Sequence, residues 1–497
     1  MLTRSERTLE NIPVGSLGII SLRGCEELGQ KVDDYLVKWR HESAHQFKGD
    51  AAFSGYEKDT FLVGASVPRF GSGEAKGIIE ESVRGKDLYL MVDVCNYNVT
   101  YSLTGNTNHM SPDDHYQNLK RIIAAIGGKG RRINVIMPFL YESRQHKRTS
   151  RESLDCALAL QELVRMGVDN IITFDAHDPR VQNAIPLSGF ETVSPTYQFI
   201  KGLLRTYKDL QIDSDHMMAI SPDEGGTNRA VYLANVLGLD MGMFYKRRDY
   251  TQVVDGRNPI VAHEFLGSSV EGKDVIIIDD MISSGESIIE VATELKRRKA
   301  NRIFAAATFG LFTNGLEKFD KAYEEGVLTG VLTTNLIYQT PELLSKPYYI
   351  NCDMSKYIAL IIDTLNHDGS LSQILSPNER IQNVLRKYRI LKIIARLIQI
   401  IHQSLQQLDN ILEIYPHLAV RNQIIVVHNR IIVFRLILRF LQLFHNIFIH
   451  CRIVFIFLLR EIIVCKQFFP ISGKCFQMCK ALIQTPKCID KRLLLLP

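Results

Sequence analysis

The sequence predicts an α/β fold built from two tandem domains, each a mainly parallel sheet flanked by helices. Short apolar runs alternate with amphipathic helical patterns between about residues 17 and 385, which is the rhythm of strand–helix–strand units. This order of fragments occurs twice, with a break near residue 200. A chain of 497 residues with 46% hydrophobic content can also bury more than one core, so two or three domains are expected.

The first half of the chain begins with a strand and a helix and then repeats that order. The expected strands are apolar runs, and the helices between them carry apolar residues at helical spacing. In chain order the fragments are LGIISL (17–22), EELGQKVDDYLVKWR (26–40), INVIMPF (133–139), SLDCALALQELVRMG (153–167) and NIITFDA (170–176). Two polar stretches rich in Gly, Ser and Asn, residues 41–59 and 96–115, are expected to be loops or small excursions.

The second half repeats this pattern with a strand, a helix, a second strand and a second helix. These fragments are HMMAIS (216–221), GTNRAVYLANVLG (226–238), VIIIDD (275–280) and IIEVATELKRRK (288–299). Four consecutive β-branched residues open the strand at 275, which suits a central parallel strand buried on both faces.

The segment after Tyr388 is a different kind of sequence. From Ile390 onward it holds one of the chain's 32 glycines, five of its nine cysteines, and fourteen Lys or Arg against four Asp or Glu. Its longest stretches without a charged residue are about a dozen residues, short of the ~18 that cross a bilayer. Three interpretations stay open: a helical appendage, helices lying on an anionic membrane surface, or read-through or out-of-frame translation past an end near Tyr388.

Four segments are therefore expected. They are an N-terminal extension (1–16), a first domain (17–200), a second domain (201–388) and an atypical tail (389–497). The net charge of +5 divides into about +10 on the tail and about −5 on the rest, and a mildly acidic body has no electrostatic footprint for nucleic acid.

The cysteines and the N-terminus indicate the compartment. The four cysteines of the body, Cys25, Cys95, Cys156 and Cys352, are scattered singly without CxxC spacing, as expected of reduced thiols. The first fifteen residues lack the apolar core of a signal peptide. These features favour a cytoplasmic enzyme.

The strand that begins at residue 275 delivers two adjacent carboxylates, Asp279 and Asp280, to a turn of small residues and the start of a helix. Free backbone N–H groups of the turn and the positive end of the helix suit an anion such as phosphate. Because the acids would repel phosphate alone, they indicate a second partner, either sugar hydroxyls or a hydrated divalent cation. An ordinary strand ending in a capped helix would also explain Ser283, Ser284 and Ser287. The cost of an unpartnered acid pair favours the binding interpretation.

Two other strand ends carry candidate ligand residues. NIITFDAHDPR places Asp175 and His177 at the carboxyl end of a strand, where open α/β sheets bind ligands, although a lone His there is more often structural. SPDEGGTNRA has Asp223 ahead of two glycines, and this tight turn lets the backbone approach a sugar or phosphate closely. A simple capped turn would look the same.

Two basic segments also follow expected strands. YESRQHKRTSR (141–151) is a solvated face or a polyphosphate site, with Arg144 and Gln145 as planar donors. FYKRRDY (244–250) brings Lys246 and Arg248 next to Arg247, either to neutralise a phosphate or only to favour solubility.

The order of these motifs resembles the ribose-phosphate pyrophosphokinase family, whose members make phosphoribosyl pyrophosphate. The motifs are RFGSGEAKGIIEESVRGKDLYL (69–90), YESRQHKRTSRES (141–153), NIITFDAHDPRVQNAIP (170–186), SPDEGGTNRA (221–230), FYKRRD (244–249) and VIIIDDMISSGES (275–287). An order shared by six motifs is more specific than any one of them. The similarity covers roughly residues 17 to 385. It implies two phosphoribosyltransferase-type domains, ATP and ribose 5-phosphate as substrates, Mg²⁺ as cofactor, and a homo-oligomer, commonly a hexamer built from dimers.

Matched motif by motif, the resemblance also implies site residues. The implied ATP contacts are Phe70 and Glu74 at the base and Arg144 and Gln145 at the polyphosphate. The implied metal residues are His177 and Asp223, and the implied catalytic cations are Lys246 and Arg248. The implied ribose 5-phosphate residues are Asp223, Asp279, Asp280, Ser283, Ser284, Gly285 and Ser287.

The chain departs from the family pattern at several of these positions. The family typically has Asn or Asp where Ser72 stands, a charged residue where Asn228 stands, and glycine where Glu286 stands. Glu286 beside a bound phosphate is unfavourable unless its side chain points away. Two alternatives therefore stay open, a non-catalytic regulatory relative of the same fold and a phosphoribosyltransferase. Nucleotide preference and allosteric control do not follow from the sequence.

Overall fold

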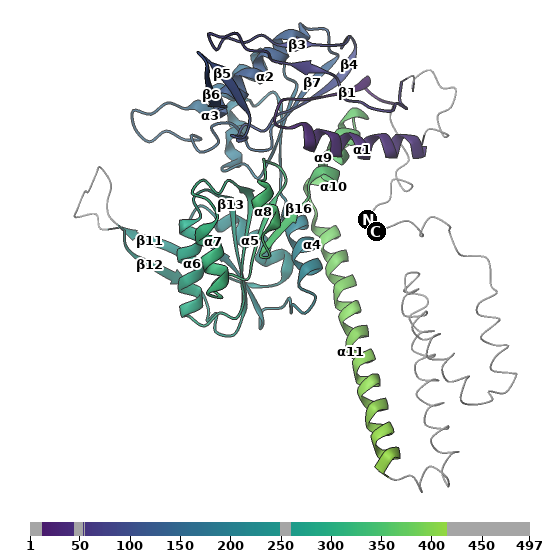
Figure 1. Cartoon of the computed structure of the whole chain (residues 1–497), viewed down its shortest axis with the longest axis vertical. Coiled ribbons are helices and arrows are strands. Elements are labelled where there is room, and N and C mark those ends of the chain that lie inside the picture. The colour runs from purple at the N-terminus through teal and green to yellow at the C-terminus, as the bar shows by residue number, and fades with distance from the viewer. Residues whose placement is uncertain (1–11, 44–52, 54, 249–259, 415–497) are drawn as a thin grey trace, which may run out of the picture. The chain divides into compact units, whose positions relative to one another are not determined.

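The computed structural model describes residues 12–43, 53, 55–248 and 260–414 (Figure 1). The chain divides into two units, residues 1–392 and 393–497. Both central sheets lie in the first unit, and each is an α/β layer structure. The expectation of two tandem α/β domains with parallel sheets flanked by helices is confirmed.

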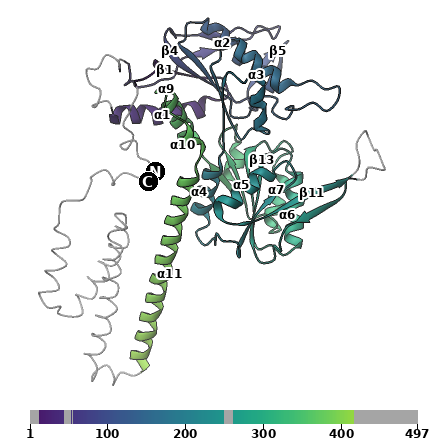
Figure 2. The same cartoon turned by 180° about the vertical axis from the view of Figure 1, so that it is seen from behind.

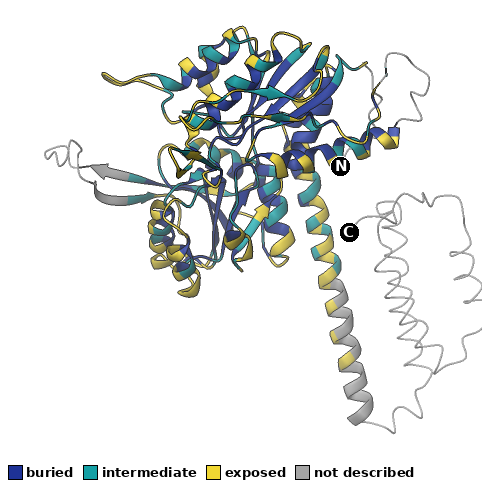
Figure 3. Ribbon diagram, turned by 45° about the horizontal axis from the view of Figure 1, so that its top comes forward, coloured by how far each residue is buried: buried dark blue, intermediate teal, exposed yellow. Residues whose placement is uncertain are grey.

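The first domain is built on a five-stranded parallel sheet in the order β1-β4-β7-β8-β9. Its strands are β1 (Ser16–Ser21), β4 (Lys86–Met91), β7 (Arg132–Ile136), β8 (Asn170–Phe174) and β9 (Gly189–Val193). The central strands form continuous apolar runs because helices cover both faces of the sheet. Figure 3 shows these strands in the colour of buried residues.

Helices and two small hairpins complete the first domain. These elements are α1 (Glu26–Ser43), β2 (Ala65–Ser66), β3 (Ile78–Ile79), β5 (Thr100–Leu103), β6 (Asn106–His109), α2 (Pro112–Ile126), α3 (Asp155–Arg165) and the 3₁₀ helix Pro179–Ala184. Residues 96–115 thus contain a hairpin and the first turn of α2 as well as loop. The helix begins there because Ser111 and Asp114 form a capping box and Pro112 fills the first turn. Part of the other expected loop, 41–59, lies outside the described residues.

The second domain has a seven-stranded sheet in the order β12-β11-β10-β13-β14-β15-β16. The strands are β10 (Met217–Ser221), β11 (Asp240–Arg248), β12 (Ile260–Leu266), β13 (Asp274–Ile282), β14 (Ile303–Gly310), β15 (Gly330–Thr334) and β16 (Tyr349–Cys352). All neighbours pair in parallel except β11 and β12, so one antiparallel strand closes an edge.

Helices cover both faces of the second sheet. They are α4 (Thr196–Thr206), α5 (Thr227–Leu237), α6 (Glu286–Arg297), α7 (Glu317–Glu324) and α8 (Pro341–Ser345). One core contains apolar residues of α4 and α5, and a second core contains those of α6 and α7. Figure 2 shows the face that carries α4 and α5.

Helix α9 (Ser355–Asn366) returns to the first domain, although its sequence lies within residues 201–388. It packs against α1, and its apolar residues Tyr357, Ile358 and Ile361 belong to the first domain's core. At its end, Asn366 donates to the buried Asp87 at 2.9 Å. The two domains are therefore joined by packing as well as by the linker between β9 and α4.

Two helices follow α9 at the end of the described chain, α10 (Ser372–Leu375) and α11 (Asn378–Ile414). The first part of α11 packs on the second domain: the Tyr388 hydroxyl donates to the Leu210 carbonyl at 3.0 Å, and Lys392 donates to the same carbonyl at 2.8 Å. No helix in the described part of the chain is both long and apolar enough to cross a membrane. Residues 415–497, which make up most of the expected tail, lie outside the described residues.

Candidate active site

The carboxyl ends of β8 and β13 bring residues of both domains together. Strand β8 ends at Phe174, and Asp175 and His177 follow directly. Strand β13 of the second domain carries Asp279 and Asp280 near its own carboxyl end. The Nδ1 atom of His177 lies 2.6 Å from Oδ2 of Asp280, so the two domains meet at these side chains. The carboxyl ends of parallel strands are where α/β sheets bind ligands.

The two adjacent acids differ in their affinity for a proton. Burial, the charge of Asp280 and the charge of Asp223 together raise the pKa of Asp279 to about 8. Burial opposes the ionisation of Asp280 as well, but the hydrogen bond to His177 and the charge of Arg229 lower its pKa. The negative charge of the pair therefore lies on Asp280, and Asp279 holds a proton near neutral pH. Sugar hydroxyls or a cation would be the natural partners of this pair.

The loop after β13 has the form of an anion site. Gly285 has φ +83°, and a Cβ atom there would lie 2.3 Å from the buried ring of Phe319, so only glycine fits. The N-cap residue of α6, Gly285, has no side chain to cap the helix, and the Ser284 hydroxyl accepts only a long bond of 3.4 Å from the Glu286 N–H, so the start of α6 can offer backbone N–H groups to a ligand. Glu286 forms an ion pair of 2.5 Å with Lys318 on α7. Lys318 thus compensates the charge of the Glu286 carboxylate, which weakens its repulsion of a phosphate bound at this loop.

Asp223 follows β10, the strand next to β13 in the sheet. Its carboxylate accepts from the Gly226 N–H at 3.1 Å, and its carbonyl accepts from the Ser221 hydroxyl at 2.6 Å. These bonds fix the turn, and the charge of Asp223 helps to raise the pKa of Asp279, after burial and the charge of Asp280. The structure thus brings Asp223, Asp279 and Asp280 to one edge of the sheet, and these three residues are called the acid cluster below.

The segment 141–151 reaches the same region through His146. The His146 ring lies 5.3 Å from the His177 ring, measured between centroids. Gln145 donates from its side-chain amide to the Ser153 carbonyl at 2.7 Å, so this amide shapes the loop, while Arg144 is exposed. The candidate polyphosphate residues therefore lie on a loop that borders the acid cluster.

Phe70 and Glu74 lie in a turn that packs on the β5–β6 hairpin. The backbone N–H of Phe70 donates to the Glu74 carbonyl at 2.8 Å, and the neighbouring Arg69 guanidinium lies 4.0 Å from the Tyr101 ring centroid. The Phe70 side chain is 55% exposed. Among the residues that the structure describes, no hydrogen bond or ion pair joins Phe70 or Glu74 to the acid cluster. These two residues are thus not brought to it within one chain.

Lys246 and Arg248 lie at the end of β11, where their backbones pair with His263 and Ile260 of β12. The positions of their side chains fall outside what the structure describes. Their role as cations at the transferring phosphate stays a prediction.

The acid cluster fits Mg²⁺ as a partner. Across the described residues, no group of three or more His, Cys, Asp or Glu forms a ready-made metal cage. Mg²⁺ usually binds one or two carboxylates together with substrate phosphates and water, so it needs no such cage. Asp223, Asp279 and Asp280 would supply the oxygens, and a divalent cation would relieve the repulsion that helps to raise the pKa of Asp279. His177 contacts Asp280 through its Nδ1 atom, and no hydrogen bond to its Nε2 atom is found among the described residues.

Three residues beside the acid cluster, Arg229, Thr308 and His146, were not identified as site residues from the sequence. Arg229 donates to Asp175 at 2.8 Å, and Thr308 donates to the other oxygen of the same carboxylate at 2.6 Å. Arg229 lies in SPDEGGTNRA and His146 in the basic segment, so both motifs contained a signal. Thr308 sits in an apolar strand, and nothing in the sequence distinguishes it.

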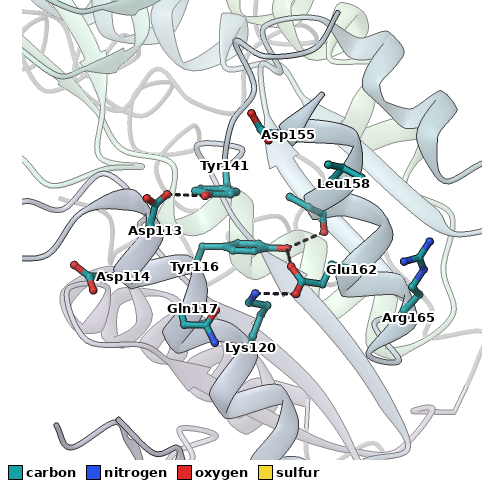
Figure 4. Close-up of a pocket in the computed structure, with 11 residues that line it drawn as sticks. Asp113, Asp114, Tyr116, Gln117, Lys120, Tyr141, Asp155, Leu158, Glu162 and Arg165 are labelled. Atoms are coloured by element: carbon teal, nitrogen blue, oxygen red, sulfur yellow. Dashed lines mark hydrogen bonds and ion pairs between the residues drawn. The ribbon is translucent and has the colours of Figure 1, made fainter. Parts of the chain in front are cut away.

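A groove of about 650 Å³ lies between α2 and α3, apart from the acid cluster. Its rings of Tyr116 and Tyr141 are stacked with centroids 4.3 Å apart (Figure 4). Its polar groups pair with one another: Tyr141 donates to Asp113 at 2.6 Å, and Lys120 donates to Glu162 at 2.8 Å. None of the residues expected at the site lines this groove.

Comparison with known proteins agrees with this architecture. Residues 17–167 match the N-terminal domain of ribose phosphate pyrophosphokinase, and residues 197–345 match the phosphoribosyl transferase domain. The ribose-phosphate pyrophosphokinase of Vibrio parahaemolyticus is 29% identical over 62% of this chain and 90% of its own length. The enzyme of that name from Ralstonia nicotianae is 30% identical over 54% of this chain and 78% of its own length.

A solved structure has the same fold. The phosphoribosylpyrophosphate synthetase of Mycobacterium smegmatis aligns with a TM-score of 0.56 and 21% identity, over 71% of this chain and all of that one. The first match covers β4, β7 and nearly all of β1 in the first sheet, and the second covers β10 to β15 in the second sheet. The chain therefore belongs to the ribose-phosphate pyrophosphokinase family.

Proposed function

We propose that this chain transfers pyrophosphate from ATP to the anomeric hydroxyl of ribose 5-phosphate, giving phosphoribosyl pyrophosphate and AMP. The observation that carries the proposal is the 2.6 Å contact between His177 of the first domain and Asp280 of the second. His177 lies in a loop of the first domain that borders the candidate polyphosphate segment. Asp280 lies on a strand of the second domain whose acids and following turn suit a sugar phosphate. A two-substrate transfer requires such a junction because the reacting groups must meet.

In this proposal the second domain holds ribose 5-phosphate. The 5-phosphate lies at the start of α6, on the backbone of residues 283–287, with the hydroxyls of Ser283, Ser284 and Ser287 nearby. Asp280 accepts hydrogen bonds from the ribose hydroxyls, directly or through the metal. Asp279 does so once its proton is lost. The anomeric hydroxyl is then directed towards the first domain.

ATP is held in this proposal by the first domain. Arg144 and Gln145 contact the polyphosphate, and Phe70 and Glu74 contact the base region. Because no described contact brings the turn of Phe70 to the acid cluster, a movement of this turn or a second copy of the chain would have to bring it there. The anomeric oxygen attacks the β-phosphorus in line and AMP leaves, so positioning and charge neutralisation matter more than a covalent intermediate.

The proposed catalytic cations are Lys246 and Arg248, which neutralise charge on the transferring group. Mg²⁺, bound near Asp223 and His177, would supply charge neutralisation at the phosphate oxygens. On the basis of the family resemblance, the proposal also includes a homo-oligomer built from dimers, such as a hexamer. It also includes a cytoplasmic location.

A regulatory relative without activity is the second candidate, because Ser72, Asn228 and Glu286 depart from the family pattern. The ion pair of Glu286 with Lys318 argues against it, since this pair removes the side chain's charge from the phosphate loop. A phosphoribosyltransferase would not need the first domain, which spans residues 17–167 in the family match.

The test is AMP release from ATP in the presence of Mg²⁺, with and without ribose 5-phosphate, over a range of phosphate concentrations. Release that depends on ribose 5-phosphate is expected for the proposed enzyme. No release at any phosphate concentration would favour the regulatory relative and end the proposal.

A further inference from the structure

One arginine of the second domain contacts both domains at the acid cluster. Arg229 lies on α5, and its side chain is 15% exposed. Its Nε donates to Oδ1 of Asp175 at 2.8 Å, and its Nη2 donates to the Ala176 carbonyl at 3.2 Å, both in the loop after β8 of the first domain. The same Nη2 lies 3.8 Å from Oδ2 of Asp280 on β13. One guanidinium therefore spans the domain boundary beside the reacting region.

The loop that Arg229 holds is in an unfavourable backbone conformation. Asp175 has φ +41°, a region that non-glycine residues adopt rarely. Its carboxylate is fixed by two donors of the second domain, Arg229 and, at 2.6 Å, the hydroxyl of Thr308 on β14. His177, two residues further on, is the residue whose Nδ1 meets Asp280. The position of the His177 ring thus depends on what holds Asp175.

We propose that Arg229 is a positioning residue: it fixes the Asp175 turn across the domain boundary and so keeps His177 aligned with Asp280. This inference rests on the proposed function, since it assigns Arg229 a part in that reaction. The planar guanidinium suits the task because it directs several N–H groups in fixed directions at once. A lysine at this position would keep the charge but lose the bridging geometry.

Contacts that do not involve Arg229 also hold the two domains together. The buried carboxylate of Asp93 in the first domain accepts from the Tyr338 N–H of the second at 2.7 Å. The rings of Phe139 and Phe309 also meet across the boundary, with centroids 5.0 Å apart. Helix α9 adds its apolar face to the first core. A change at Arg229 is therefore expected to alter alignment and to leave the domains docked.

The first test compares Arg229→Lys and Thr308→Val with Arg302→Lys in the full chain. Arg302 is a matched control because it is a partly buried arginine of the second domain, bound to Asp274 at 2.7 Å outside the cluster. Arg229→Lys should lower turnover about 10- to 100-fold, since small misalignments of reacting groups have effects of this size. The Michaelis constants of both substrates should change less than about threefold, because Arg229 is not assigned to either substrate.

Thr308→Val should lower turnover in the same way but less, because Asp175 keeps its bond to Arg229. The double variant should lose less than the product of the two single effects, since both side chains act through Asp175. A rise in one substrate's Michaelis constant with unchanged turnover would overturn the proposal, because it would make Arg229 a direct substrate ligand. Fully multiplicative effects would overturn it as well.

A second measurement works without activity. Hydrogen exchange of the peptide covering residues 174–178 reports on the Asp175 N–H, which bonds to the Val193 carbonyl at 3.0 Å. Arg229→Lys should speed exchange in this peptide and leave the peptide around Tyr338 unchanged. Unchanged exchange at 174–178 would overturn the positioning role. An inactive wild-type chain with the expected exchange pattern would instead refute the proposed function alone.

Discussion

The unusual proton affinity of Asp279 leads to a prediction about stability. Its folded pKa of about 8 lies above the ordinary value of 3.8, because the carboxyl is buried beside Asp280. The folded state therefore holds a proton that the unfolded state has already lost between these pH values. Stability in the absence of ligand is then highest below about pH 4 as far as this group is concerned, and it falls as the pH rises to about 8.

The substitution Asp279→Asn removes this pH dependence and keeps the shape. Its Oδ1 can still accept from the Asp280 N–H, a bond of 2.9 Å in the structure. A shift of about four pKa units corresponds to about 6 kcal/mol as an upper limit, at about 1.4 kcal/mol per unit. Because the protonation of Asp279 and that of Asp280 depend on each other, the effect should be smaller than this limit. We expect Asp279→Asn to stabilise the folded protein by about 2 kcal/mol at pH 9 and almost not at all at pH 4.

The assay is the melting temperature of wild type and variant in metal-free buffer between pH 4 and 9. The variant should melt about 2 to 5 °C higher at pH 9. Added Mg²⁺ should stabilise the wild type more than the variant, because the ionised pair is the better ligand. Glu286→Gln is the control: that exposed acid has its pKa lowered by Lys318, so its loss should give no gain at high pH. Parallel melting curves for Asp279→Asn and wild type at every pH would refute this reasoning.

Three further predictions concern catalysis and the tail. Lys246→Ala should lower turnover about 10²-fold or more with the fold intact, because it removes charge needed in the transition state; near-normal turnover would end the assignment. Asp280→Asn should raise the Michaelis constant for ribose 5-phosphate about 10- to 100-fold and that for ATP less, since the charged acceptor serves the sugar; equal weakening of both would contradict it. Truncation after Lys392 should preserve activity and reduce self-association, because it removes a sequence rich in apolar runs; size-exclusion chromatography and turnover check this, and loss of activity would show that the tail belongs to the enzyme.

The sequence predicted strands correctly where the strand is buried along most of its length. Strands β1, β8, β10 and β13 are apolar runs inside parallel sheets, so their composition alone predicted them. The antiparallel edge strand β12 was not predicted, because His263 and Glu264 interrupt its apolar run and an edge strand pairs with only one neighbour. The return of α9 to the first core depends on long-range packing that local periodicity does not encode.

The candidate site was predicted in parts rather than as a whole. The order of motifs identified the family, which the domain matches confirm. The contact of His177 with Asp280 joins residues 103 positions apart and could not be read from spacing. Thr308 was missed because a hydroxyl in a buried strand is unremarkable in sequence. The individual roles of the site residues stay predictions.

The most direct test of the proposed reaction follows both phosphorus atoms of the transferred group. Phosphorus NMR of ATP, ribose 5-phosphate and Mg²⁺ with the full chain resolves AMP, ADP, inorganic phosphate and a diphosphate on the sugar. We expect AMP and sugar diphosphate in equal amounts, with the β- and γ-phosphorus of ATP transferred together, and both signals should grow about 10²-fold more slowly in Lys246→Ala. ADP with a singly phosphorylated product, or no reaction at any phosphate concentration, would contradict it.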